Sequence, residues 1–203
     1  MNPIRKGLVL GVIVLLITVI VIPSTGQDIK KSSFEPLNGR ILYVGGDGPG
    51  NYSRLWKAVF DSEDGDTVFC YNGTYTGIHK YLEITKSISI VGEDKNSTFI
   101  RFTKIMFLAP EITLRGFTIH NSYSSYIITI DTSDNLLEDL RVKSNPYGIW
   151  LFSKAENNIL RNLIIEDIGK TGLWIDGGKN NKISNSIIRN NGRDGVYVSN
   201  ADK

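Results

Sequence analysis

Three aromatic residues in the C-terminal half of the chain stand at a spacing that suits ligand binding. Trp150, Trp174 and Tyr197 are 24 and 23 residues apart, and each lies between aliphatic neighbours in an alternating pattern. Stacked on one face, such rings would form a flat ladder that suits the apolar faces of sugars. We therefore predict carbohydrate binding at these residues. The alternative is that the rings pack beneath a loop, a neighbouring domain or a further C-terminal segment.

Carboxylates and cations in the same region offer acid–base chemistry. A polysaccharide lyase or epimerase needs a carboxylate or Ca²⁺ to neutralise an acidic sugar, and a base to remove a proton. The candidate acids and bases are Asp131, Asp134, Asp176, Asp194, Arg161 and Arg189. No motif selects among them, so the catalytic residues stay unknown and an enzymatic function is an alternative hypothesis.

Charged residues also recur at a spacing of 23. The two series are Arg115, Glu138, Arg161 and Lys143, Glu166, Arg189. In each series an acid stands between two bases, and opposite charges on neighbouring strands contribute about 0.2–1 kcal/mol per pair. We interpret both series as structural ion pairs rather than as a catalytic site.

These spacings belong to an internal repeat of 23 residues. One column of the repeat holds Gly116, Asp139, Asn162 and Asn185. Two aliphatic columns flank it, and their members are Leu114, Leu137, Leu160, Ile183 and Ile119, Val142, Ile165, Ile188. Around each aromatic residue the apolar residues alternate with a period of two, which indicates strands rather than the helices of a helical repeat.

The repeat predicts an all-β fold, a single-stranded right-handed parallel β-helix with coils of about 23 residues. One coil cannot bury its apolar side alone, but stacked coils bury one continuous core. The right hand follows from the strong preference of parallel crossovers. Polar pairs at 134–135, 157–158 and 180–181 should lie at turns, where stacked Asn side chains can bond along the solenoid.

The β-helix should occupy residues 39–203, with a helical cap over about 51–62. Asn51 is the expected N-cap of this helix. Its apolar stripe consists of Leu55, Ala58 and Val59. Such a cap would cover the open end of the first coil, because an exposed coil edge pairs with other chains.

The first 23 residues resemble a targeting segment. Two basic residues precede an apolar run over residues 7–22, as in a signal peptide or a membrane anchor, and a polar linker follows over 24–38. We expect export to the cell surface, either secreted or anchored through residues 7–22; cleavage and retention are both open. Three N-x-S/T sequons, at Asn51, Asn72 and Asn96, are then candidate glycosylation sites.

From about residue 40 onward the chain resembles pectin-lyase-like right-handed parallel β-helix proteins. The resemblance rests on residues 51–58, 64–68, 72–75 and 84–93. The later coils resemble the β-helix repeats of the NosD-like periplasmic copper-binding family, which implies a copper site. Copper sites need clustered His, Cys or Met, whereas this chain has two His, one Cys and two Met. We therefore expect no metal and no cofactor.

The remaining single residues carry little chemistry. His79 lies in an irregular segment, His120 lies on a strand, and Cys70 is most simply a small buried side chain. The formal net charge of +2 is accounted for by two N-terminal basic residues. A nucleic-acid binder would show a basic excess on one face, so we expect no nucleic-acid partner.

The favoured function is an exported, non-catalytic surface scaffold with a polysaccharide or a surface protein as partner. A polysaccharide lyase, epimerase or hydrolase of the pectin-lyase-like fold is the first alternative. The second alternative is an incomplete fragment of a larger surface protein, because the chain stops at Lys203 just after a strand and before the next expected Asn pair.

Overall fold

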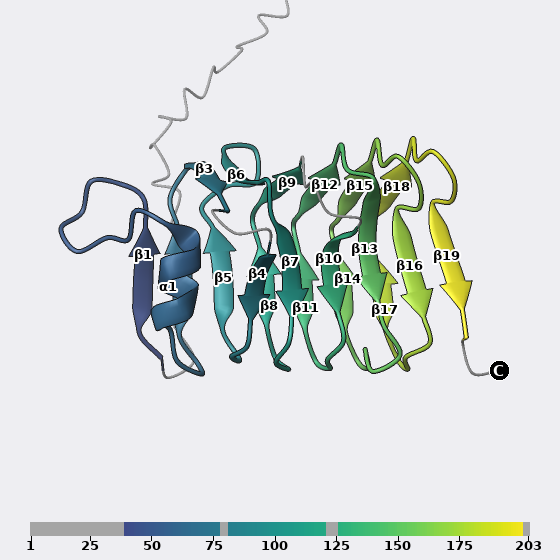
Figure 1. Cartoon of the computed structure of the whole chain (residues 1–203), viewed down its shortest axis with the longest axis horizontal. Coiled ribbons are helices and arrows are strands. Elements are labelled where there is room, and N and C mark those ends of the chain that lie inside the picture. The colour runs from purple at the N-terminus through teal and green to yellow at the C-terminus, as the bar shows by residue number, and fades with distance from the viewer. Residues whose placement is uncertain (1–38, 78–80, 121–125, 201–203) are drawn as a thin grey trace, which may run out of the picture. The chain divides into compact units, whose positions relative to one another are not determined.

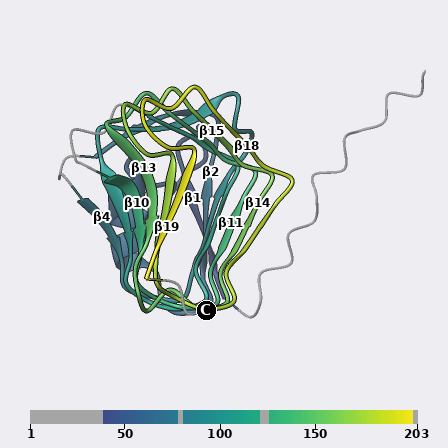
Figure 2. The same cartoon turned by 90° about the vertical axis from the view of Figure 1, so that its right-hand side faces the viewer.

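A computed structural model describes residues 39–77, 81–120 and 126–200 of the chain. These residues form a solenoid of three parallel sheets, and each complete coil passes through the three sheets in turn (Figure 1). Figure 2, viewed along the solenoid, shows the sheets around one shared interior. The expected β-solenoid is therefore confirmed for these residues, and each complete coil holds three strands.

Sheet A has the order β1-β2-β5-β8-β11-β14-β17. Its strands are β1 (Ile41–Val44), β2 (Thr67–Cys70), β5 (Ser89–Gly92), β8 (Thr113–Arg115), β11 (Leu136–Glu138), β14 (Ile159–Arg161) and β17 (Lys182–Ser184). Sheet B contains β3 (Gly73–Thr76), β6 (Thr98–Arg101), β9 (Thr118–His120), β12 (Arg141–Lys143), β15 (Ile164–Glu166) and β18 (Ile187–Arg189). Sheet C contains β4 (Tyr81–Ile84), β7 (Lys104–Phe107), β10 (Tyr126–Ile130), β13 (Tyr147–Leu151), β16 (Leu173–Asp176) and β19 (Val196–Ser199).

The strand register reproduces the repeat found in the sequence. In sheet A, Leu137 lies beside Leu160, and in sheet B, Val142 lies beside Ile165. All four side chains are fully buried. The two aliphatic columns therefore form the continuous core that stacked coils were expected to share.

The polar column lies at the corner between sheets A and B. Gly116, Asp139, Asn162 and Asn185 have φ values of 78°, 51°, 56° and 47°. Glycine, Asn and Asp tolerate this left-handed conformation better than other residues, which explains the residue types of the column. Gly116 is also required by space, because a Cβ there would lie 2.3 Å from the carbonyl oxygen of Gly92.

A ladder of asparagine side chains lines the turn that leads into sheet A. Asn135 Nδ2 donates to Asn158 Oδ1 at 2.8 Å, and Asn158 Nδ2 donates to Asn181 Oδ1 at 2.9 Å. Each Oδ1 also accepts from a backbone N–H of the preceding coil. The predicted bonding along the solenoid is thus confirmed, and it satisfies buried backbone groups at an irregular turn.

The helix α1 (Leu55–Asp61) is shorter than predicted. It contacts β1 and β2 at the N-terminal end of the solenoid (Figure 1). Its expected stripe of Leu55, Ala58 and Val59 is buried in the core. The prediction of Asn51 as N-cap is wrong. Arg54 holds that position without a side-chain cap, because the Asn51 amide instead donates to the Gly45 carbonyl at 2.7 Å and closes the preceding loop.

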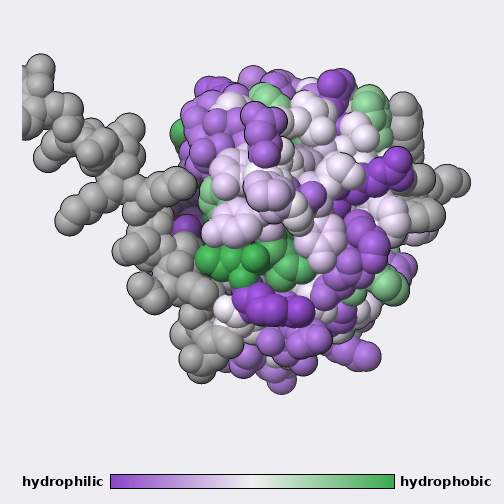
Figure 3. Space-filling model, turned by 90° about the vertical axis from the view of Figure 1, so that its left-hand side faces the viewer, coloured by the Kyte–Doolittle hydropathy of each residue, from purple (hydrophilic) through white to green (hydrophobic). Residues whose placement is uncertain are grey.

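The two ends of the solenoid differ in polarity. Figure 3 shows that the surface at the α1 end is mostly hydrophilic or intermediate, with a hydrophobic area near its centre and smaller ones around the rim. In the coil of β17, β18 and β19, aliphatic side chains are exposed instead. Ile183 and Val196, for example, follow the buried Leu160 and Leu173 in their columns.

The targeting segment 1–23 and the linker 24–38 predicted from the sequence lie outside the described residues. Within the part of the chain that the structure describes, no helix combines the length and hydrophobicity needed to cross a membrane.

Candidate functional site

The three aromatic residues singled out from the sequence are neighbours on the outer face of sheet C. Trp150 on β13 lies beside Trp174 on β16, and Trp174 lies beside Tyr197 on β19. The strand alternation places them outward, because the adjacent Ile149 and Leu151 point into the core and are fully buried. The predicted column is therefore formed.

The rings do not form the flat ladder that we expected. Trp150 and Trp174 are stacked, with ring centroids 4.7 Å apart and planes 8° apart. Trp174 and Tyr197 meet edge to face, at 5.6 Å and 68°. Neighbouring strands are only about 4.8 Å apart, which is too close for indole rings to lie side by side in one plane. Trp150 and Trp174 consequently turn their faces toward each other along the solenoid.

Further aromatic residues that the sequence reasoning missed enclose Trp150. The ring of Phe152 lies 3.9 Å from that of Trp150, and the ring of Tyr126 lies 4.5 Å away. Tyr126 is buried, and it lies beside Tyr147 on the neighbouring strand. That pair is 21 residues apart, so a search at a spacing of 23 passes over it. We call the six residues Tyr126, Tyr147, Trp150, Phe152, Trp174 and Tyr197 the sheet C aromatic cluster.

The cluster has an enclosed part and an open part. Tyr197 is 39% exposed and Trp174 is half-buried. Burial raises the pKa of Tyr126 to about 12, which keeps its hydroxyl neutral. The indole nitrogen of Trp150 is buried and has no hydrogen-bond partner among the described residues. Tyr197 is therefore the most exposed member of the cluster, and Trp174 beside it is half-buried, as are Tyr147, Trp150 and Phe152.

Polar groups border the open rings at both ends of their strands. At one end, Trp174 Nε1 donates to Ser199 Oγ and Ser199 Oγ donates to Asp176 Oδ1, both at 2.8 Å. At the other end, Arg193 lies 5.7 Å from the ring centre of Tyr197, and Lys170 donates to the Tyr147 hydroxyl at 2.8 Å. The arrangement combines aromatic surface with flanking hydrogen-bonding groups, as ligand sites do.

The candidate catalytic acids are not brought together. Asp176 ends β16, whereas Asp194 precedes β19 at the opposite end of the strands, where it contacts Arg193 at 3.1 Å. Asp134 has a left-handed φ of 60° in the turn before β11, and Asp131 is exposed just after β10. The four carboxylates thus show no common cleft.

The candidate bases lie on other sheets and are engaged in ion pairs. Arg161 on β14 binds Glu138 at 2.7 Å, and Arg115 lies 3.9 Å from the same carboxylate. Arg189 on β18 binds Glu166 at 2.6 Å. The structural interpretation of both charge series agrees with this geometry.

One detail of the second charge series differs from the prediction. Lys143 lies beside Glu166 in the register, but the close contact from that coil is made by Arg141, at 3.1 Å. The longer guanidinium side chain reaches the carboxylate from the next outward position of the same strand, two residues before Lys143.

Among the described residues, no three His, Cys, Asp or Glu side chains lie close enough together to hold a metal ion. His120 is half-buried on β9, where its ring meets the edge of Phe99 at 6.0 Å. Cys70 is a free, buried thiol whose pKa is raised by burial, as expected for a core side chain. His79 lies outside the described residues.

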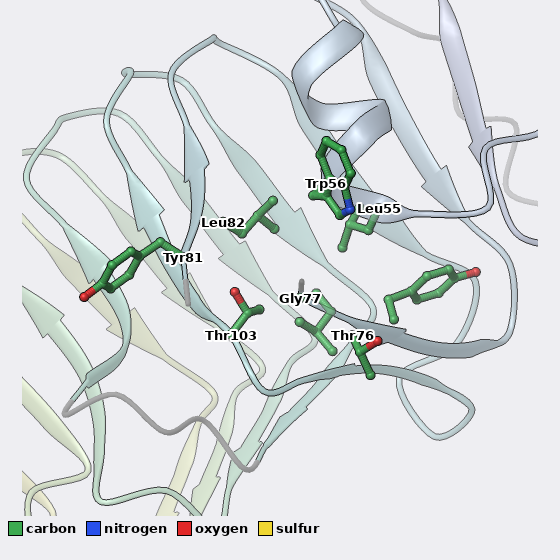
Figure 4. Close-up of a pocket in the computed structure, with 9 residues that line it drawn as sticks. Leu55, Trp56, Thr76, Gly77, Tyr81, Leu82 and Thr103 are labelled. Carbon is green, nitrogen blue, oxygen red and sulfur yellow. The ribbon is translucent and has the colours of Figure 1, made fainter. Parts of the chain in front are cut away.

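Two hollows elsewhere on the molecule offer less than the aromatic cluster. A small apolar pocket lies between α1, β3 and β4 (Figure 4). Its lining includes Leu55, Trp56 and Leu82. A polar hollow lies over the Gly92–Gly116 contact, and its walls include the paired Arg115 and Glu138. The apolar pocket also has an exposed ring, Tyr81, and the hydroxyls of Thr76 and Thr103 in its lining, but it lacks the column of rings on successive coils that sheet C provides.

The three sequons lie close to the N-terminal coils. Asn72 and Asn96 belong to neighbouring coils, and the Ser97 hydroxyl donates to Asn72 Oδ1 at 2.7 Å. Asn51 lies in the loop that follows β1. Glycosylation of the three sequons stays a prediction.

Comparison with known proteins yields a fold family. A family model described as "Right handed beta helix region" matches residues 66–203. No curated protein and no solved structure matches the chain.

Proposed function

Because the chain belongs to the right-handed β-helix family, we propose that it is an exported, non-catalytic surface scaffold that binds polysaccharide through the outer face of sheet C. The family itself supplies only the scaffold, since one fold supports many activities. The observation that carries the proposal is the adjacent pair of rings formed by half-buried Trp174 and exposed Tyr197, bordered by hydrogen-bonding groups.

The spacing of the coils supports a polymeric ligand. Successive coils place one outward aromatic residue about every 4.8 Å along the solenoid, which is close to the length of one sugar unit. A glycan chain lying along the column can therefore contact Trp174 with one sugar and Tyr197 with the next. The hydroxyl groups of those sugars then meet Ser199 and Asp176 on one side and Arg193 on the other.

Export follows from the basic residues and the apolar run over 7–22, which is typical of a signal peptide or an anchor. An extracellular polysaccharide is a ligand that an exported scaffold can reach. The association with the membrane belongs to this N-terminal segment, and the binding face belongs to sheet C.

The experiment is a glycan-array measurement on the full chain, followed by titration of the glycans that bind. Trp174→Ala and Tyr197→Ala should each weaken binding about 10-fold, which corresponds to about 1.4 kcal/mol and is typical of one aromatic contact. Trp150→Ala should also weaken binding, because its ring supports Trp174. Phe60→Ala is the control, since it removes an exposed ring on α1 and should leave binding unchanged.

Two results would contradict the proposal. A folded chain that binds no glycan on the array has no carbohydrate function of this kind. A chain whose affinity for a glycan survives both Trp174→Ala and Tyr197→Ala binds through another surface. Circular dichroism of each variant distinguishes lost binding from lost folding.

A further inference from the structure

A second group of aromatic residues lies on the outer face of sheet A, at the opposite end of the solenoid from Tyr197. Tyr43 on β1 lies beside Phe69 on β2, and Tyr71 follows at the end of β2. The rings of Tyr43 and Tyr71 are stacked, 6.0 Å apart and inclined by 24°, and Phe69 meets both edge to face. We call these three residues the sheet A aromatic patch.

A glycine-rich loop covers only part of this patch. Gly46 lies so close to Tyr71 that a Cβ there would be 2.8 Å from the tyrosine Cδ2 atom. The loop thus rests against Tyr71, and Tyr43 stays 40% exposed beside it. Exposed aromatic rings of this kind commonly form a contact surface. The residues next to the patch indicate which group would lie against Tyr43.

Asn72, the residue after Tyr71, begins one of the three sequons, and it is held in place by the next coil. Its Oδ1 accepts hydrogen bonds from Ser97 Oγ at 2.7 Å and from Thr98 Oγ1 at 3.2 Å. Its side-chain nitrogen donates no hydrogen bond within the described part of the chain. Asn72 and the sequon hydroxyl of Thr74 are both exposed. The acceptor nitrogen and the hydroxyl that the sequon requires are therefore accessible in the folded chain.

The other two sequons are less accessible in the folded state. The Asn51 amide nitrogen donates to the Gly45 carbonyl at 2.7 Å and closes the glycine-rich loop. The Asn96 amide nitrogen donates to Asp94 Oδ1 at 3.1 Å, and its sequon hydroxyl, on Thr98, is fully buried. Of the three, Asn72 alone combines an unengaged nitrogen with an exposed hydroxyl.

We propose that Asn72 is an N-glycosylation site of the folded chain and that the first sugars of its glycan lie on the sheet A aromatic patch. In the modification step, Asn72 Nδ2 bonds to the anomeric carbon of a lipid-linked oligosaccharide. The bond between that carbon and the phosphate oxygen breaks, the lipid pyrophosphate leaves with the electron pair, and the amide proton passes to a base of the transferase.

The covalent link explains why this glycan would occupy the patch. Adjacent Cα atoms are about 3.8 Å apart, so the attachment point at Asn72 is one residue from Tyr71 of the patch. Attachment makes the contact intramolecular and raises the effective concentration of the sugar to about the millimolar range. A contact between a sugar and a tyrosine ring then avoids the free-energy cost of bringing two separate molecules together. This proposal rests on the export proposed above, but it concerns sheet A and does not depend on glycan binding at sheet C.

Transfer to the folded protein tests the acceptor site. Folded, detergent-solubilised full chain is incubated with an oligosaccharyltransferase and a lipid-linked oligosaccharide, and the product is analysed by peptide mass spectrometry. One glycan should be found at Asn72, Asn72→Gln should abolish the transfer, and Asn96→Gln should leave it unchanged. Absence of transfer to the folded wild-type chain, or transfer that survives Asn72→Gln, would overturn the assignment.

Thermal unfolding tests the contact with the patch. The glycosylated chain should unfold about 2–4 °C above the unmodified chain. A shift of this size is expected when one modest contact stabilises a protein of 150–250 residues. Tyr43→Ala should bring this difference close to zero, whereas Tyr81→Ala, which removes a somewhat more exposed tyrosine on β4, should preserve it. A glycan-dependent shift that persists in Tyr43→Ala would show that the sugars lie elsewhere.

Discussion

At the scale of single residues, Glu166 shows how a charge is held in a mostly apolar fold. Its side chain is 9% exposed and lies between Arg189 at 2.6 Å and Arg141 at 3.1 Å. The hydrogen bonds from Arg189 and the charge of Arg141 hold the pKa of Glu166 below its usual value, against the opposing effect of burial. The partner at 23 residues was predictable from the repeat. Arg141 was not, because its reach depends on side-chain conformation.

The lowered pKa of Glu166 predicts an acid-sensitive stability. The Glu166 carboxyl binds a proton more readily in the unfolded chain than in the folded chain. The stability that its ion pairs contribute is therefore fully present above the unfolded pKa of about 4.3 and is lost as the pH falls below it. Glu166→Gln should lower the free energy of unfolding by about 1–2 kcal/mol at pH 7, a value reduced by the exposure of Arg189. The substitution should also weaken the dependence of the free energy of unfolding on pH between pH 5 and pH 3, as measured by urea unfolding.

The matched control for this prediction is Glu156→Gln, which changes an exposed acid in a turn of the same coil. It should leave both the stability and its pH dependence unchanged within about 0.5 kcal/mol. If both variants show the same acid dependence as the wild type, other carboxylates govern the acid transition.

At the scale of elements, the asparagine ladder connects the turns that lead into β11, β14 and β17. Asn158 is its central member and is fully buried. It accepts from the backbone N–H and from the side chain of Asn135, and it donates to the Thr132 carbonyl at 3.1 Å and to Asn181. The ladder replaces regular strand pairing at a place where the chain changes direction, so it fixes the register between coils.

Removal of the central asparagine should therefore be costly. Asn158→Ala leaves two donors of Asn135 without their acceptor in a buried turn, and each such loss costs about 1–3 kcal/mol. We expect a loss of about 2–4 kcal/mol in the free energy of unfolding, measured by urea denaturation. Glu156→Ala, in the same turn but exposed, should stay within about 0.5 kcal/mol. Equal effects of the two substitutions would show that the ladder contributes no stability.

At the scale of the whole molecule, the solenoid is stabilised by contacts between neighbouring coils. The inward columns continue through every complete coil, but their burial changes along the axis. Ile165 is fully buried between β12 and β18, whereas Ile188, its partner in the next coil, is only half-buried. Chemically equivalent positions of the repeat are therefore energetically different.

This difference can be measured with the same substitution at two positions of one column. Ile165→Ala should lower the free energy of unfolding by about 2–5 kcal/mol, the usual range for a buried isoleucine. Ile188→Ala should cost less than half as much, because its methyl groups already contact solvent. Urea denaturation of both variants provides the comparison, and equal losses would mean that burial in the last described coil is greater than the structure shows.

Much of the fold was predictable, and the candidate site was predictable only in part. The column of Trp150, Trp174 and Tyr197 was predicted correctly, since strand pairing at a spacing of 23–24 residues determines which residues are neighbours. The ring orientations were not, because they follow from the short distance between strands and from Phe152 and Tyr126. The helix start was misplaced because Asn51 found a different acceptor.

The sequence by itself determined the repeat, the strand character of each coil and the residue types at the corners. It could do so because these properties follow from local periodicity and from the backbone preferences of Gly, Asn and Asp. Only the tertiary structure decided which rings are open, which ion pairs close and which sequon is accessible. Those properties depend on contacts between coils, where neighbours of irregular spacing, such as Tyr126 and Tyr147, compete for the same space.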